Sequence, residues 1–123
     1  MIGALLRSPG RLSALALAGS GLAIALMPSR TGTVLAIPAT TTRGTAETRA
    51  GLGGTFAALG LWAALRGSRD AYSAVGMTWL GAAAFRLLSL RLDEPETDAT
   101  YWAYLAGELV LGAAGVAARG RTA

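Results

Sequence analysis

The 123-residue sequence contains no cysteine and no histidine, and both absences limit the chemistry it can perform. Without cysteine the chain has no disulfide, no thiolate nucleophile and no thiolate metal ligand. Without histidine it has no imidazole ligand for zinc or haem and no imidazole general base. It also lacks a P-loop, a paired-glycine dinucleotide motif and the G-x-S-x-G turn of hydrolases. We therefore expect a protein that is not an enzyme and that holds no cofactor and no metal.

Charge is also scarce, since charged residues make up 15% of the chain, against about 25% in an ordinary soluble domain. The few charges separate four long, nearly uncharged stretches. A helix that is apolar on every side belongs in lipid or in the core of a large protein, and this chain is too short to bury four of them. The sequence therefore predicts a single all-α domain over residues 1–123. Its predicted form is an antiparallel four-helix transmembrane bundle, with spans at residues 12–29, 50–65, 71–90 and 100–118.

All 11 basic residues are arginine, and their distribution between the two ends of such a bundle predicts its orientation. One side carries Arg7, Arg11, Arg66, Arg69, Arg119 and Arg121. The other side carries Arg30, Arg43, Arg49 and Arg91, together with most of the acidic residues. This bias favours the inner (cytoplasmic) membrane with both termini in the cytoplasm. Because the arginines form no stripe, no nucleic-acid partner is expected.

Two segments admit more than one interpretation. A basic start followed by the apolar run at residues 12–29 also describes a secretory signal peptide. The run is long for that purpose and Pro38 is badly placed for cleavage, so we expect an uncleaved first helix. Residues 28–46 form the longest connection, in which Pro38 should stop any helix. We expect an exposed loop that touches the lipid headgroups, and the alternative is a lid over the outer end of the bundle.

Two ionisable residues, Arg86 and Glu108, lie within the third and fourth apolar stretches. Burying either one alone in lipid costs at least about 2.5–3.5 kcal/mol, so each should have a partner. Arg86 lies five residues from Arg91 and Glu108 seven residues from Tyr101, where the acidic connection ends the two spans. At a rise of about 1.5 Å per residue, their depths are roughly 7–8 Å and 10–11 Å below the same surface. The sequence therefore predicts an ion pair between the two helices.

Further polar residues should lie in the same outer half of the bundle. The candidate polar cluster or ligand site comprises Glu47, Arg49, Arg86, Ser89, Asp93 and Glu108. Three interpretations remain open: an interhelical clasp that fixes packing, a pocket for an anionic or lipid-like ligand anchored by arginine, and a proton or ion pathway that uses Glu108.

Small residues recur at a spacing that lets helices approach closely in lipid. The pairs are Gly53-xxx-Ala57, Gly54-xxx-Ala58 and Gly60-xxx-Ala64 on the second span and Ala103-xxx-Gly107 on the fourth. Aromatic residues near predicted span ends are candidates for the membrane interface: Tyr72, Tyr101 and Trp102. Trp79 falls in the middle of a span and should pack against another helix.

Two stretches resemble a bacterial family of small four-helix membrane proteins of unknown function. Residues 47–54 (ETRAGLGG) are similar to its E-x-R-A-x-x-G-G signature, and residues 85–90 (FRLLSL) to its G-R-x-x-S-L segment, with Phe85 where glycine is usual and Leu52 where an aromatic is common. Asp93 and Glu108 also match. The resemblance covers roughly residues 47–118 and implies a four-helix membrane fold without any known activity.

We expect a non-enzymatic accessory subunit that stabilises a larger membrane complex, for instance a transport complex. Its partners would be the lipid bilayer and a protein within that assembly. The main alternative is a carrier or binding protein for a lipid or small anion, held at Arg49 and Arg86. A membrane enzyme that uses Glu108 as its acid or base is the third interpretation.

Overall fold

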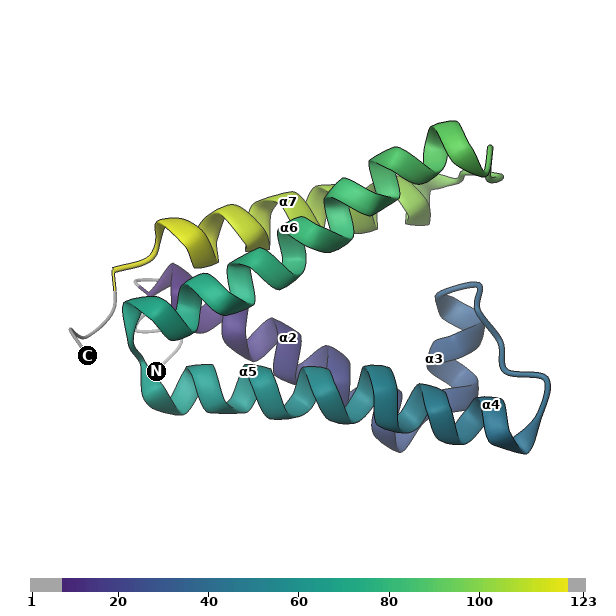
Figure 1. Ribbon diagram of the computed structural model, residues 1–123, viewed down its shortest axis with the longest axis horizontal. Helices are drawn as coiled ribbons and strands as arrows, with labels where there is room; N and C mark the ends of the chain where they lie inside the picture. The colour runs from purple at the N-terminus through teal and green to yellow at the C-terminus, as the bar shows by residue number, and fades with distance from the viewer. Residues whose placement is uncertain (1–7, 120–123) are drawn as a thin grey trace.

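The computed structural model describes residues 8–119, and the chain is all-helical, as the sequence predicts. The helices are α2 (Pro9–Leu26), α3 (Pro28–Val34), α4 (Thr42–Glu47), η1 (Thr48–Gly54), α5 (Thr55–Arg66), α6 (Arg69–Leu92) and α7 (Ala99–Ala117). The segments α4, η1 and α5 follow one another without a break, and η1 is a π-helix. Residues 8–119 therefore form four long helical segments, with α3 as a short fifth element; their arrangement is shown in Figure 1.

Local signals explain where most of these helices begin and end. Proline occupies the first turn of α2 and of α3, where its missing N–H costs no hydrogen bond. The side chains of Ser68 and Asp98 cap the N-termini of α6 and α7 by accepting hydrogen bonds from backbone N–H groups. Gly67 ends α5 in the left-handed conformation, with φ 64°. The turn between α5 and α6 is consequently as tight as the sequence predicts.

The expectation of one exposed loop over residues 28–46 was wrong, because this connection contains α3 and α4. Pro28 does not end helical structure but starts a new helix after Met27. Thr41 caps α4 by accepting a hydrogen bond from the N–H of Gly44 at 2.9 Å. Proline at the first turn and threonine at the N-cap both favour helix initiation. The prediction of a loop rested only on the helix-breaking role of Pro38.

Among the described residues, two helices, α2 and α6, are long and apolar enough to cross a membrane, judged by length and composition. The structure supports these two of the four predicted spans. The second predicted span is divided: α5 alone has 12 residues, fewer than the roughly 20 needed to cross a bilayer, and η1 precedes it. The fourth, α7, has 19 residues with Glu108 near its middle and is not among the helices that meet this criterion.

The four long segments form two hairpins, and the helices run antiparallel within each. In one, α2 packs against η1 and α5; in the other, α6 packs against α7. The start of α2, the α5–α6 turn and the end of α7 lie together at one end of the molecule (Figure 1). At the opposite end the two hairpins diverge, and α3 and the acidic connection between α6 and α7 lie there.

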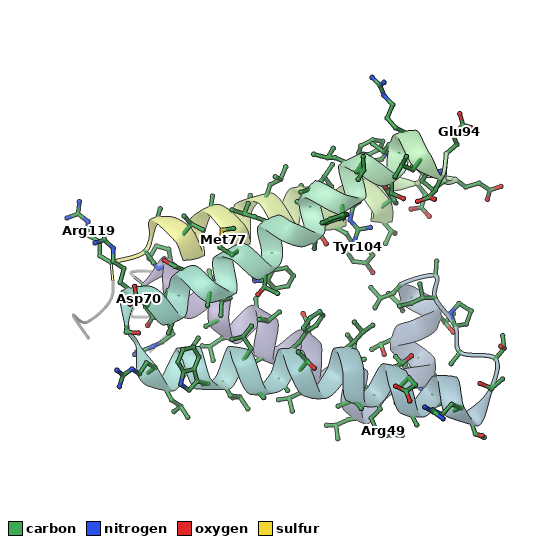
Figure 2. All side chains as sticks on the ribbon, viewed as in Figure 1. Arg49, Asp70, Met77, Glu94, Tyr104 and Arg119 are labelled. Carbon is green, nitrogen blue, oxygen red and sulfur yellow. The ribbon has the colours of Figure 1, made fainter. Side chains whose placement is uncertain are left out.

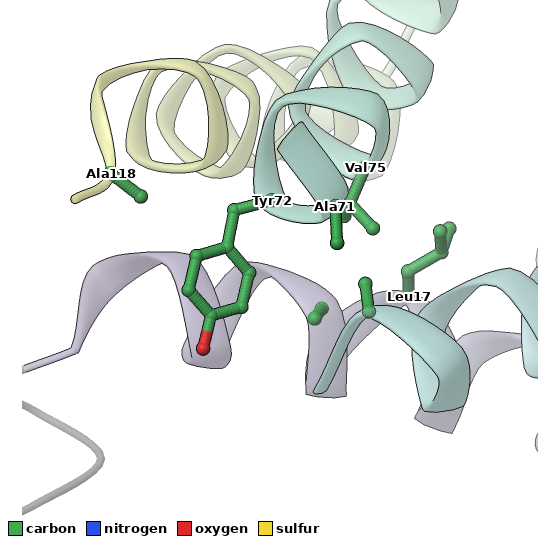
Figure 3. Packing of buried hydrophobic residues seen from close by; sticks show 7 residues of the cluster. Leu17, Ala71, Tyr72, Val75 and Ala118 are labelled. Atoms are coloured by element: carbon green, nitrogen blue, oxygen red, sulfur yellow. The ribbon is translucent and has the colours of Figure 1, made fainter. Parts of the chain in front are cut away.

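The buried core lies toward the end where the hairpins meet, and there α2 packs against α6 and α7 as well as against α5. Leu17 of α2 and Val75 of α6 are almost fully buried, together with Ala71, Tyr72 and Ala118 (Figure 3). Tyr72 was predicted at the membrane interface, but its side chain packs in this core and the residue is 3% exposed. Its position near a helix end misled the prediction, because the helices converge there and cover it.

Glycines allow backbone-to-backbone packing within each hairpin. A Cβ atom at Gly60 would lie 2.4 Å from the backbone nitrogen of Ala18 on α2, and one at Gly76 would lie 2.5 Å from that of Val116 on α7. No side chain fits at such distances, so glycine is required at both contacts. The predicted role of Gly60 in close packing is confirmed, and Gly53 meets Ala25 of α2 in the same way.

Two of the predicted small-residue contacts were wrong. A Cβ at Gly107 would meet nothing within 4 Å, and Gly54 would meet only the carbonyl of Arg49 on its own segment. On α7 the packed face instead contains Glu108, Gly112 and Gly115, which are buried. These three recur at helical spacing, whereas Gly107 is turned about 100° away from them.

Candidate functional site

The side chains of Arg86 on α6 and Glu108 on α7 form a two-point ion pair. Nε of Arg86 donates to Oε1 of Glu108 at 2.7 Å, and Nη2 donates to Oε2 at 3.0 Å. The carboxylate side is buried, with 9% of the Glu108 side chain exposed, against 26% for Arg86. Parallel guanidinium–carboxylate bonds of this kind are the strongest geometry available to such a pair. The predicted pairing between the two helices is therefore confirmed.

Two tyrosines of α7 complete the surroundings of the arginine. The hydroxyl of Tyr101 donates to the backbone carbonyl of Arg86 at 3.0 Å. The guanidinium carbon lies 5.2 Å from the centre of the Tyr101 ring and 5.8 Å from that of Tyr104. Both distances are within the range of cation–π attraction. The side chain of Arg86 is thus held by a carboxylate and by the two rings.

This role of the two tyrosines was not predicted, although their spacing in the sequence indicates it. Tyr101, Tyr104 and Glu108 are spaced three and four residues apart, so they lie on one face of the helix. A face that presents a carboxylate to an arginine on the next helix presents these rings to the same arginine.

Ser89 and Asp93 form a separate contact one turn beyond Arg86. The Ser89 hydroxyl donates to a carboxylate oxygen of Asp93 near the end of α6. Ser89, Arg86 and Tyr101 also line a shallow hollow of the α6–α7 hairpin. These two residues therefore lie at the same end as the ion pair, as predicted, and Ser89 is a neighbour of Arg86 in that hollow.

Glu47 and Arg49 do not contact the ion pair. Oε1 of Glu47 accepts a hydrogen bond from Nε of Arg43, one turn earlier in the exposed α4 segment, at 2.6 Å. Nη1 of Arg49 donates to the carbonyl of Ala25 at the C-terminal end of α2, also at 2.6 Å. That carbonyl belongs to the last turn of a helix, which lacks internal donors and attracts positive charge.

The predicted cluster of six residues therefore divides into four separate local contacts at the diverging end. Glu47 and Arg49 belong to the hairpin of α2 and α5, and the other four belong to the hairpin of α6 and α7. Depth along a helix can be computed from sequence, but the lateral separation of two hairpins cannot. Arg49 lies on the first of these hairpins and Arg86 on the second, and the two hairpins diverge at this end (Figure 1).

The buried polar atoms of the ion pair all have hydrogen-bond partners. Within residues 8–119 no buried side-chain nitrogen or oxygen lacks a hydrogen-bond partner. The same residues contain no group of three or more acidic, histidine or cysteine side chains that could hold a metal ion. An anion that binds Arg86 would have to compete with Glu108, which already occupies two of its donors. The geometry is that of a link between two helices.

Comparison with known proteins adds no identity. No family model, no curated protein and no solved structure matches the chain. The resemblance to the bacterial membrane family therefore stays a prediction from the sequence.

Proposed function

We propose that this chain is a small, non-enzymatic integral membrane protein that stabilises a larger membrane assembly by packing its lipid-facing surface against it. In this proposal all four long helical segments lie in the inner membrane and both termini are cytoplasmic. The observation that carries it is the exposure of large apolar side chains on every long segment. One example from each is Leu22 at 42%, Trp62 at 51%, Phe85 at 72% and Val110 at 67% exposed.

The longest helix, α6, is the most exposed example. Only 17% of its most apolar 18-residue stretch is buried inside the protein. A core helix of a soluble domain would be mostly buried, because apolar side chains in contact with water cost about 25 cal/mol per Å². Lipid, or a partner helix within lipid, removes that cost.

Membrane integration and orientation can be tested together, because the chain has no native cysteine. Single cysteines at Asp70, in the first turn of α6, and at Glu94, in the acidic connection, would be offered to a membrane-impermeant maleimide on intact cells. We expect labelling at position 94 and none at position 70 until the cells are opened. Release of the protein by an alkaline carbonate wash, or labelling at position 70 alone, would contradict the proposed location and orientation respectively.

The partner can be located by photo-crosslinking in native membranes. A photoreactive residue would replace Leu22, Trp62, Phe85 or Val110 in turn, with the buried Ala83 of α6 as the matched control. We expect crosslinks to a protein partner at those of the four exposed positions that lie on neighbouring helix faces, and none at Ala83. The level of the crosslinked partner should fall when this chain is deleted. Crosslinks to lipid alone at all four exposed positions would refute the accessory role.

A carrier or binding protein for a lipid or small anion held jointly at Arg49 and Arg86 stays a prediction. Binding of inorganic phosphate that is abolished equally by Arg49→Gln and Arg86→Gln would favour it. The separation of these arginines onto two hairpins makes such joint binding depend on closure of the diverging end.

A further inference from the structure

A second hollow, of about 360 Å³, lies at the diverging end, between α2, α3 and α7. Ala23 and Ile24 of α2 form one wall, Val34 of α3 forms another, and Tyr104 of α7 closes it from the second hairpin. Tyr104 extends from α7 into the region between the two hairpins (Figure 2). The volume falls within the range of small-ligand sites.

The chemistry of this hollow is that of a site for an amphiphile. Its lining is mainly apolar, and Arg30 in the first turn of α3 is the one charged residue among the described residues that line it. Arg30 is exposed, so its guanidinium is accessible to a headgroup outside the hollow. An apolar chamber with a single arginine at its edge is complementary to an apolar chain that carries one negative group.

We propose that an anionic phospholipid of the surrounding bilayer binds here, with part of an acyl chain in the hollow and its phosphate at Arg30. This inference rests on the proposed membrane location. The connection that carries Arg30 belongs to the end predicted to lie outside, where a basic residue opposes the orientation rule. A bound anionic headgroup would explain why an arginine occurs at this end of the protein.

The site also bears on the ion pair through Tyr104. One side of this residue lines the hollow, and its ring centre lies 5.8 Å from the guanidinium carbon of Arg86. A chain that occupies the hollow would contact α2, α3 and α7 at once. Occupancy should therefore link the two hairpins where they diverge and raise the thermal stability of the protein.

The test uses the full chain reconstituted in nanodiscs that contain equal parts of phosphatidylglycerol and phosphatidylcholine. Native mass spectrometry after release into detergent would count each retained lipid. We expect phosphatidylglycerol to be retained preferentially, and Arg30→Gln to lower its retention about fivefold, the effect expected for one arginine near an anionic headgroup. Arg43→Gln, which removes the same charge from the same connection outside the hollow, should change retention less than twofold.

A second pair of variants tests the apolar part of the site. Ala23→Leu would fill the hollow and should reduce phosphatidylglycerol retention although Arg30 is intact. Ala106→Leu, at an exposed position of α7 that does not line the hollow, should leave retention unchanged. Melting followed by circular dichroism, with and without added phosphatidylglycerol, would confirm that each variant folds and would show whether lipid stabilises it.

Several outcomes would overturn the inference. These are equal retention of both lipids, equal effects of Arg30→Gln and Arg43→Gln, and retention of a free fatty acid or a co-purified peptide in place of phosphatidylglycerol. If the protein is integral to the membrane by the carbonate wash but shows no lipid preference, only this inference fails. If the carbonate wash releases the protein, the proposed function fails with it.

Discussion

Replacing Arg86 by leucine should destabilise the protein more than replacing Glu108 by leucine. Arg86→Leu leaves a carboxylate whose side chain is only 9% exposed without a counter-charge, and removal of one partner of a buried pair costs about 3–5 kcal/mol. Glu108→Leu leaves an arginine that is 26% exposed and that can extend its long side chain toward the polar surface. We expect losses of about 3 kcal/mol and about 1–2 kcal/mol respectively.

The double variant is the stricter test. With both charges replaced by leucine no uncompensated charge remains, so its stability should return to within about 1 kcal/mol of the wild-type protein. The two sites would then show an interaction energy of about 3–5 kcal/mol. The assay is unfolding by sodium dodecyl sulfate in a fixed detergent background, followed by far-ultraviolet circular dichroism.

Arg91→Leu serves as the control for this series. Arg91 is exposed in the last turn of the same helix, so its replacement should change stability by no more than about 0.5 kcal/mol. The reasoning would be refuted if Arg86→Leu behaved like the control. It would also be refuted if the double variant lost as much stability as the two single variants together.

Three further predictions concern packing and can be measured by the same unfolding assay. Gly76→Ala should separate α6 from α7 and lower the free energy of unfolding by about 2 kcal/mol or more. Gly107→Ala should leave it unchanged or raise it by up to about 1 kcal/mol. Similar effects of the two substitutions would refute the assigned packing face. Ser13→Ala should cost about 1 kcal/mol, because its buried hydroxyl donates to the Leu111 carbonyl at 2.7 Å, and a neutral result would deny that link between α2 and α7. Arg49→Gln should cost about 1 kcal/mol by removing the 2.6 Å bond to the C-terminal turn of α2, and a loss as large as that of Arg86→Leu would contradict its exposed, local role.

The sequence identified the features that depend on position along a single helix. Helical content, the tight turn at Gly67 and the matching heights of Arg86 and Glu108 all follow from local patterns with a fixed rise per residue. Trp79 was expected to pack against another helix, and its indole nitrogen does donate to the carbonyl of Ser13 at 3.3 Å. These predictions succeeded because they needed no knowledge of how the hairpins are placed.

Features that depend on the placement of one hairpin beside the other were decided only by the tertiary structure. The sequence grouped Glu47 and Arg49 with Arg86, yet the divergence of the hairpins gives these residues different partners. The hollow beside Tyr104 is likewise formed by residues from three helices, and no spacing along one of them predicts it. Apolar periodicity and charge determine which residues share a face and a depth. The azimuth of each helix follows from the close glycine contacts within each hairpin, and the angle between the hairpins follows from the packing of α2 against α6 and α7 in the core.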